Sequence, residues 1–246
     1  MIGSILRKPG SVQVVQRISR AACLLLFAAC PVVDVAAQSP QTANIQPQAL
    51  SPLDLAKRID EHYNHLQSLK TAFHEEYDGL GMHRSESGTL LLRKPGRMRW
   101  DYQSTPGKVF VLDGKYGWFY TPGDTQVQRI ASSQLDDLRS PLRFLLGHTK
   151  IESELENMKL TLTSQPGKAP IYTLTGIPKG QGKRIAKLAL TVTPNGTIQN
   201  IEIEEMDGAQ TRFAFTGEEA NTTIPETAFH FAPPKGVPVV DALPPV

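Results

Sequence analysis

The sequence predicts a mostly β, α+β fold: an incomplete, unclosed antiparallel β-barrel of about ten or eleven strands, with helices over its concave face. From Leu69 onward, apolar and polar residues alternate with a period of two, which is typical of strands with one buried and one solvated face. Turn signals built on Pro, Gly and Asn recur about every 8 to 12 residues, as they do in all-β folds. Helix signals stand mainly at residues 51–66 and 135–146.

An amphipathic helix is predicted to begin at Ser51-Pro52. Serine is a favourable N-cap and proline suits the first helical position, while Asp54 lies in the first turn, where the helix dipole stabilises an acid. Apolar residues then recur at steps of three and four: Leu53, Ala56, Ile59, Tyr63 and Leu66. This spacing indicates one apolar stripe facing the sheet.

A first block of strands follows this helix. The pattern predicts a strand around Phe73 and Tyr77, and then strands at Glu86–Arg93, Arg97–Tyr102, Val109–Leu112, Tyr116–Thr121 and Gln126–Ile130. Asp113-Gly114 is a strong hairpin signal between the fourth and fifth strands. In the third strand Met98, Trp100 and Tyr102 alternate with polar residues, a stripe that is typical of ordinary core and also suits a ligand-binding surface.

A leucine-rich helix and a second block of strands complete the pattern. Ser140-Pro141 repeats the cap-and-proline start, and Gly147 ends the helix. The strands are predicted at Lys159–Thr163, Ile171–Gly176, Ile185–Thr193, Thr197–Glu205, Thr211–Thr216 and Phe229–Phe231. The apolar parity shifts once between Ile198 and Ile201, which indicates a β-bulge.

The N-terminal 37 residues are typical of a secretory signal peptide. A basic region ends at Arg20, a short apolar run follows, and Val35-Ala36-Ala37 offers small residues for cleavage. Residues 38–50, rich in Gln, Pro and Ala, are expected to be a flexible leader, and residues 51–246 a single domain. The apolar run is about half the ~20 residues that a spanning helix needs, so an uncleaved anchor is the weaker alternative.

Both cysteines, Cys23 and Cys30, lie in this signal, which leaves no cysteine for disulfides, thiolate catalysis or metal sites. Phe27-Ala28-Ala29-Cys30 resembles the box at which bacterial lipoproteins are cleaved and lipidated, although Phe is unusual at its first position. Lipidation at Cys30 is therefore an alternative to cleavage near Ala37.

Composition and motifs argue against several functions. Without the signal, the chain keeps 22 of its 26 basic and 23 of its 24 acidic residues, a net charge of −1 that gives no support for nucleic-acid binding. His62 and His65 have helical spacing but lack a third metal ligand. Residues 176–183 have the wrong glycine spacing for a phosphate loop, and no Gly-x-Ser-x-Gly motif occurs. We therefore expect no enzyme activity, no metal and no cofactor.

A specific set of residues spans most of the chain after the leader. It comprises Phe73, Gly88, Lys94-Pro95, Trp100, Pro106, Asp113-Gly114, Trp118-Phe119-Tyr120-x-Pro122, Gln126-Val127, Ser140-Pro141 and Phe229-x-Phe231-x-Pro233-Pro234-x-Gly236-Val237. In this pattern the chain resembles the LolA family of periplasmic outer-membrane lipoprotein carriers. Members of that family commonly carry Arg where this chain has Lys94, and Phe where it has Met98.

The resemblance implies an unclosed β-barrel with a helical lid over an apolar cavity, in a periplasmic chaperone. Its expected partners are acylated lipoproteins, an inner-membrane ABC complex that releases them, and an outer-membrane lipoprotein receptor. We expect a monomer that binds no ATP itself. A membrane-anchored receptor or envelope-stress sensor on the same fold is the alternative, which lipidation at Cys30 would favour.

Within this frame, the site residues fall into three sets. The cavity is predicted to be lined by Leu90, Leu92, Met98, Trp100, Val109, Val111 and Trp118, and the lid to contribute Leu142, Leu145 and Leu146. The faces of the Val109 and Trp118 strands stay open, because apolar residues occur there at both parities. Lys94, at the end of a strand, is predicted to hold the lid through backbone carbonyls, less firmly than an arginine fork would.

The signal analysis predicts a periplasmic protein whose N-terminus lies near Gln38, because the apolar run is short and small residues follow it. Cell fractionation with intact-mass analysis checks this expectation. Recovery mainly in a membrane fraction, as a species triacylated at Cys30, would contradict it and favour the anchored alternative.

Overall fold

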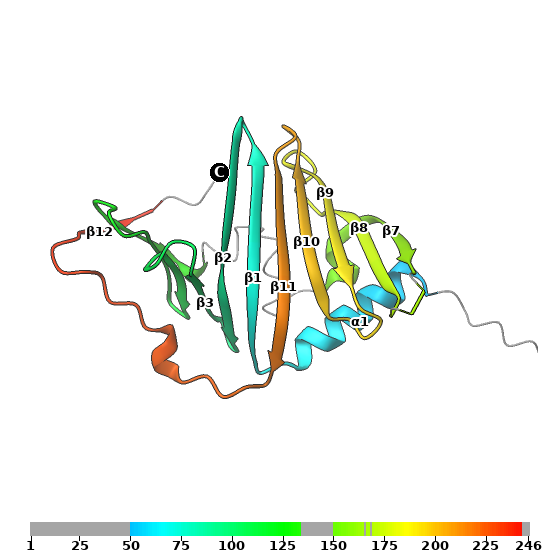
Figure 1. The fold of residues 1–246 in the computed structure, drawn as a ribbon, viewed down its shortest axis with the longest axis horizontal. Coiled ribbons are helices and arrows are strands. Elements are labelled where there is room, and N and C mark those ends of the chain that lie inside the picture. Colours follow the sequence, from blue (N-terminus) through cyan, green and yellow to red (C-terminus); the bar gives the residue numbers. More distant parts are fainter. Residues whose placement is uncertain (1–49, 134–149, 165, 168, 243–246) are drawn as a thin grey trace, which may run out of the picture. The chain divides into compact units, whose positions relative to one another are not determined.

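The computed structural model describes residues 50–133, 150–164, 166–167 and 169–242, whose strands join into one twelve-stranded sheet (Figure 1). Its strand order is β12-β6-β5-β4-β3-β2-β1-β11-β10-β9-β8-β7. The strands are β1 (Ser68–Gly79), β2 (Met82–Arg93), β3 (Arg97–Tyr102), β4 (Val109–Asp113), β5 (Tyr116–Tyr120), β6 (Val127–Ala131), β7 (Leu155–Thr163), β8 (Ile171–Pro178), β9 (Ile185–Val192), β10 (Ile198–Glu205), β11 (Gln210–Ala220) and β12 (Val239–Asp241).

The sheet is not closed, since β7 and β12 are its two edges. All neighbouring strands are antiparallel except β12 and β6, which pair in parallel. The predicted mostly β, unclosed fold is thus confirmed, with twelve strands rather than ten or eleven. Strand β1, the first of the first block, pairs with β11, the last of the second block. This pairing joins the two blocks at the centre of the sheet.

Helix α1 (Pro52–His65) begins as predicted. The Ser51 hydroxyl accepts a hydrogen bond from the Asp54 amide at 3.1 Å, and the Asp54 carboxylate accepts one from the Ser51 amide. Leu55, rather than the expected Leu53, belongs to the buried stripe; Leu53 is 40% exposed. The buried residues Leu55, Ala56, Ile59 and Tyr63 nevertheless lie within one apolar face of the helix.

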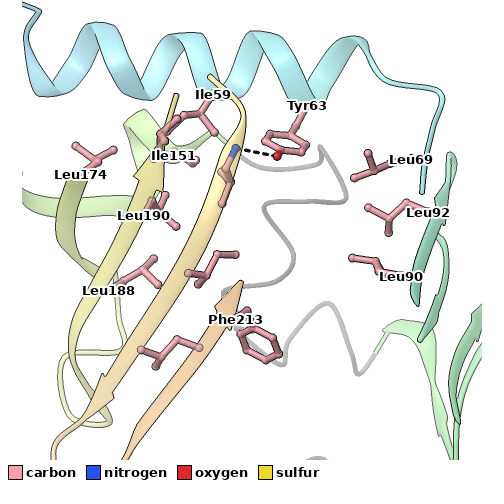
Figure 2. Close-up of a cluster of buried hydrophobic side chains, with 14 of the residues drawn as sticks. Ile59, Tyr63, Leu69, Leu90, Leu92, Ile151, Leu174, Leu188, Leu190 and Phe213 are labelled. Carbon is pink, nitrogen blue, oxygen red and sulfur yellow. Dashed lines mark hydrogen bonds between the residues drawn. The ribbon is translucent and has the colours of Figure 1, made fainter. Parts of the chain in front are cut away.

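Helix α1 packs against one face of the sheet, which we call the inner face; the opposite side is the outer face. Its apolar side chains join a single buried cluster with residues of both blocks of strands, among them Leu69, Leu92 and Leu190 (Figure 2). A short helix, α3 (Ile151–Glu154), which the sequence analysis missed, is joined to α1 by a hydrogen bond from the Ile151 amide to the Asp60 carboxylate, 2.9 Å long. Helix α1 therefore covers part of an otherwise exposed apolar face.

The strand β10 carries the predicted bulge. Its pairing with β9 shifts between Ile198 and Asn200, so Ile198, Ile201 and Ile203 are all buried although their spacing breaks the two-residue period. The extra residue lets the strand keep its apolar side chains inward on both sides of the irregularity.

The C-terminal segment differs from the predicted strand at Phe229–Phe231. Residues Glu226–Phe229 form a short 3-10 helix, η2, because the Ala228 and His230 amides bond to carbonyls three residues earlier rather than to a neighbouring strand. The two phenylalanines that suggested a strand instead pack against other parts of the fold. Phe229 is buried, and the Phe231 ring lies 5.7 Å from that of Trp118. The chain then adds β12 to the edge of β6, a strand that the sequence pattern did not reveal.

The predicted leucine-rich helix at 135–146 and its lid residues lie outside the described residues, as do the signal peptide and all of the leader except Leu50. Among the helices that are described, none combines the length and the apolar character needed to cross a membrane.

The turn between β9 and β10 generates a testable prediction. Gly196 has φ +93°, and a Cβ added there would lie 2.4 Å from the Arg58 carbonyl oxygen of α1. Gly208 has a similar φ of +88° but no neighbour within 4 Å, so it reports backbone strain alone. We expect Gly196→Ala to lower the free energy of unfolding by about 1–3 kcal/mol more than Gly208→Ala does. Chemical denaturation of both variants measures this difference, and equal losses would show that the turn does not seat α1.

Candidate functional site

Four of the predicted cavity residues share the inner face. The register pairs Leu90 with Trp100 and Leu92 with Met98, and directly paired residues of neighbouring strands point to the same side of a sheet. All four are at most 5% exposed and belong to the cluster that α1 covers. The structure thus brings these four residues together on the inner face, in the same buried cluster as the apolar side chains of α1.

Trp100 is the centre of an aromatic group on this face. Its ring lies 4.6 Å from Phe73, 5.7 Å from Phe213 and 6.5 Å from Phe215, all in edge-to-face geometry. The indole N–H points to the Met98 sulfur at 2.9 Å. Phe213 and Phe215 were missed by the sequence analysis, although they alternate along β11 and Phe215 pairs directly with Phe73. Their two-residue spacing in the sequence was the signal that could have placed both rings on one face of the sheet.

Contrary to expectation, the other three predicted cavity residues do not lie beside Trp100. They are on the outer face of the sheet: Val109, Val111 and Trp118. The register pairs Trp100 with Phe110 and Arg99 with Val111, so Val111 points away from Trp100. Trp118 pairs with Val111 and follows it to the outer face. There, Trp118 contacts Phe231, and its indole N–H donates to the Asp113 carboxylate at 2.8 Å. The strand β4 is apolar at both parities because the C-terminal segment covers its second face.

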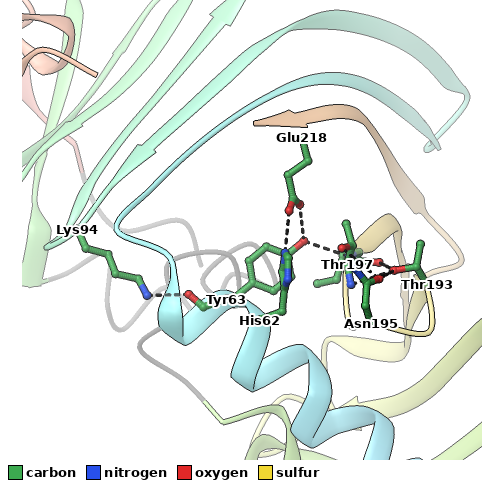
Figure 3. Close-up of polar contacts among 8 residues, drawn as sticks. His62, Tyr63, Lys94, Thr193, Asn195, Thr197 and Glu218 are labelled. Carbon is green, nitrogen blue, oxygen red and sulfur yellow. Dashed lines mark hydrogen bonds and ion pairs between the residues drawn. The ribbon is translucent and has the colours of Figure 1, made fainter. Parts of the chain in front are cut away.

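Lys94 reaches the C-terminal end of α1. Its ammonium group donates to the carbonyl oxygen of Tyr63 at 2.7 Å (Figure 3). It also donates to the carbonyl oxygen of Asn64 at 2.9 Å. A helix end leaves such carbonyls without partners within the helix. A cation there also interacts favourably with the helix dipole. Partial burial lowers the pKa of Lys94. Lys94 was predicted to hold carbonyls of the lid; the lid residues lie outside the described part of the chain, and the helix carbonyls that Lys94 contacts in the structure belong to α1.

Tyr63 attaches the same helix end to the second block of strands. Its hydroxyl accepts a hydrogen bond from the buried Ile198 amide at 3.0 Å and donates to Glu218 at 3.3 Å (Figure 3). Burial, followed by the nearby Glu218 carboxylate, raises the pKa of Tyr63. Glu218 also contacts His62 at 2.7 Å. The last turn of α1 is therefore fastened to both blocks of the sheet, through Lys94 on one side and Tyr63 on the other.

Comparison with known proteins identifies the family. The sequence profile described as "Outer membrane lipoprotein carrier protein LolA" matches residues 64–232, well over half of the chain. The chain belongs to the LolA family. A relative from Chromobacterium violaceum, named outer-membrane lipoprotein carrier protein, is 29% identical over 174 residues, which cover 71% of this chain and 81% of the relative. A relative of the same name from Pectobacterium carotovorum is 27% identical over 191 residues, covering 76% and 88%.

Solved structures give a weaker likeness. A LolA superfamily protein from Nitrosomonas europaea is similar with a TM-score of 0.40 at 12% identity, over 74% of this chain and 99% of the other. The lipoprotein LppX of Mycobacterium tuberculosis has a TM-score of 0.47 at 13% identity, over 71% and 97%.

The two histidines considered as metal ligands in this LolA family member, His62 and His65, have structural partners. His62 contacts Glu218, and the His65 ring nitrogen contacts the Glu61 carbonyl at 2.6 Å. Within residues 50–242, so far as they are described, no group of three or more His, Cys, Asp or Glu side chains is arranged to hold a metal ion.

Proposed function

We propose that the chain is a periplasmic chaperone that binds the acyl chains of lipoproteins and carries them to the outer membrane. The inner face centred on Trp100 is the observation that carries this proposal. Each methylene group removed from water contributes roughly 0.8 kcal/mol, so acyl chains need an apolar surface if they are to cross an aqueous space. The names of the relatives and the family membership support the same function.

The acyl chains would contact Leu90, Leu92, Met98 and Trp100, with Phe213 and Phe215 extending the surface toward β11. These side chains are covered: the first four are at most 5% exposed. An acyl chain therefore reaches them only when a covering element moves. Among the described elements, α1 and the short helix α3 contribute side chains to the buried cluster on this face.

The partners follow from the route of the cargo. A carrier of this family would receive acylated lipoproteins from an inner-membrane ABC complex and deliver them to an outer-membrane receptor, acting as a monomer without ATP or another cofactor. Release must follow binding, so the cover over the inner face has to return when the cargo leaves. That return is the step in which we place Lys94.

Lys94 is proposed to hold the covered state through its two hydrogen bonds to the end of α1. A net hydrogen bond contributes about 0.5–1.5 kcal/mol, enough to change an opening equilibrium several-fold. Arginine at this position would present a planar fork of donors and hold the carbonyls in a more fixed geometry. The lid residues Leu142, Leu145 and Leu146 remain part of the proposal as further cover.

Charge placed on the inner face tests the binding surface. Trp100→Glu is expected to lower the affinity for acylated lipoprotein at least about tenfold, since a carboxylate is costly in an apolar site. Trp118→Glu is the matched control, because the same substitution then lies on the outer face. Phe215→Glu, at a less buried position of the inner face, replaces Trp100→Glu if that variant does not fold. Binding titrations on proteins with native circular dichroism measure the effect; equal losses on both faces would refute the assignment.

Substitution of Lys94 tests the gate. Lys94→Leu removes the donor to the two carbonyls, so it is expected to open the cover and to slow lipoprotein release. Lys94→Arg offers these carbonyls more donors, so it is expected to favour the covered state. Transfer rates to the outer-membrane receptor, together with a fluorescent probe attached to α1, measure both effects. Lys70→Leu is the control, because the Lys70 ammonium pairs with Glu219 rather than with these carbonyls. Identical rates and probe signals for all variants would leave Lys94 without a gating role.

A further inference from the structure

Two carboxylates lie side by side on the inner face, next to the aromatic group. Glu75 of β1 pairs directly with Glu86 of β2, and both point to the same side as Phe73, two residues before Glu75. Glu75 is 8% exposed and Glu86 6% exposed, although charged residues are rarely buried this far unless they are fully paired. The side chain of Glu75 also has Phe213 as its direct neighbour on β11.

The two carboxylates differ in how well they are satisfied. The Lys108 ammonium lies 2.6 Å from both oxygens of Glu86, and 4.3 Å over the ring of Tyr102. Glu75 has a single long contact, 3.4 Å from its Oε1 to an Arg84 Nη2. Its second oxygen has no hydrogen-bond partner among the described residues. Glu86 is thus held by its own lysine, while Glu75 keeps free acceptor capacity.

Arg84 complements Glu75 as a donor. Its contacts with Glu75 and Glu86 are both long, at 3.4 and 3.3 Å, and 56% of its side chain is exposed. Guanidinium N–H groups therefore remain available beside a carboxylate oxygen that is available as an acceptor. A peptide or ester group, which offers a carbonyl and in the peptide an N–H, matches such a pair.

The fold itself gains little from Glu75. Burial is the main cause that raises the pKa of Glu75, which indicates that its charged form is poorly compensated. Replacing a buried ionic group with an apolar one of similar volume is often neutral or stabilising. An apolar residue could therefore replace Glu75 without cost to the core. Because Glu75 lies beside Phe213 and the aromatic group around Trp100, its carboxylate is suited to bind a ligand.

The position fits the boundary of the cargo. Along β1, Phe73 and Glu75 are about 7 Å apart, so a ligand whose acyl chains pack on the aromatic group would bring its polar end to Glu75. Building on the carrier function proposed above, we propose that Glu75 and Arg84 form a polar subsite for the amide and ester groups at the acylated N-terminus of a lipoprotein. Glu75 accepts from peptide N–H groups, and Arg84 donates to carbonyl oxygens.

Two probes separate this subsite from the apolar surface. One is a tripalmitoylated cysteinyl peptide; the other is phenylnaphthylamine, an apolar fluorescent probe without ester or peptide groups. We expect Glu75→Leu to weaken binding of the lipopeptide about tenfold, as for loss of a hydrogen bond to a charged group. Binding of phenylnaphthylamine should stay within about twofold of the wild-type value. Arg84→Gln should reproduce this selective loss, and it carries the test if Glu75→Leu does not fold.

Glu76→Leu is the matched control, since Glu76 is the next residue on the same strand, points to the outer face and is 43% exposed in its side chain. An unchanged lipopeptide affinity in Glu75→Leu and Arg84→Gln would overturn the subsite, and so would a parallel loss of both probes. If the wild-type protein bound phenylnaphthylamine but not the lipopeptide, the subsite would be wrong while the apolar surface stands. Binding of neither probe would overturn the carrier function together with the subsite.

Discussion

The contact between α1 and the inner face is the constraint on which the rest of the structure depends. An unclosed sheet of this size leaves one apolar side that must be covered, and Leu55 and Ile59 of α1 supply that cover against residues of both blocks. Acyl chains would use the same surface. In the proposed carrier, cargo and helix would therefore compete, and the apparent affinity for cargo would be reduced by the free energy needed to uncover the face. That free energy would include the lost burial of the apolar side chains of α1 as well as the polar contacts at its end.

Much of the sheet could be predicted from the sequence because its period is strict. The alternation around Trp100 gave the correct face for that strand, and the change of parity after Ile198 gave the bulge. Alternation could not predict which side chains of β4 face inward, because three successive residues there are apolar: Val109, Phe110 and Val111. Its orientation depends on a second covering layer, formed by the C-terminal segment more than 100 residues later in the chain. Local pattern carries no information on which side such a distant segment packs.

The candidate site was predictable to the same degree. Lys94 was identified from its place at a strand end and from the arginine that relatives carry there; its predicted partners were lid carbonyls, and the sequence did not show that α1 supplies the carbonyls it contacts. Phe213 and Phe215 needed the pairing of β1 with β11, which joins segments about 140 residues apart. Glu75 lies in the strand that was predicted around Phe73 and Tyr77, but alternation along that strand does not show its burial. The burial depends on residues of neighbouring strands, among them Phe213 and Glu86.

The two unpaired edges of the sheet have a consequence for capacity. In a closed barrel, the number of strands and their stagger fix the diameter. Here β7 and β12 are not bonded to each other, so no ring of hydrogen bonds fixes the circumference. A small change in the twist between neighbouring strands, summed across the sheet, moves these edges apart while every ladder stays intact. In the proposed carrier, the space that opens when the cover moves could thereby widen or narrow with the bulk of its cargo, and one set of side chains could enclose cargoes with different numbers and lengths of hydrocarbon tails.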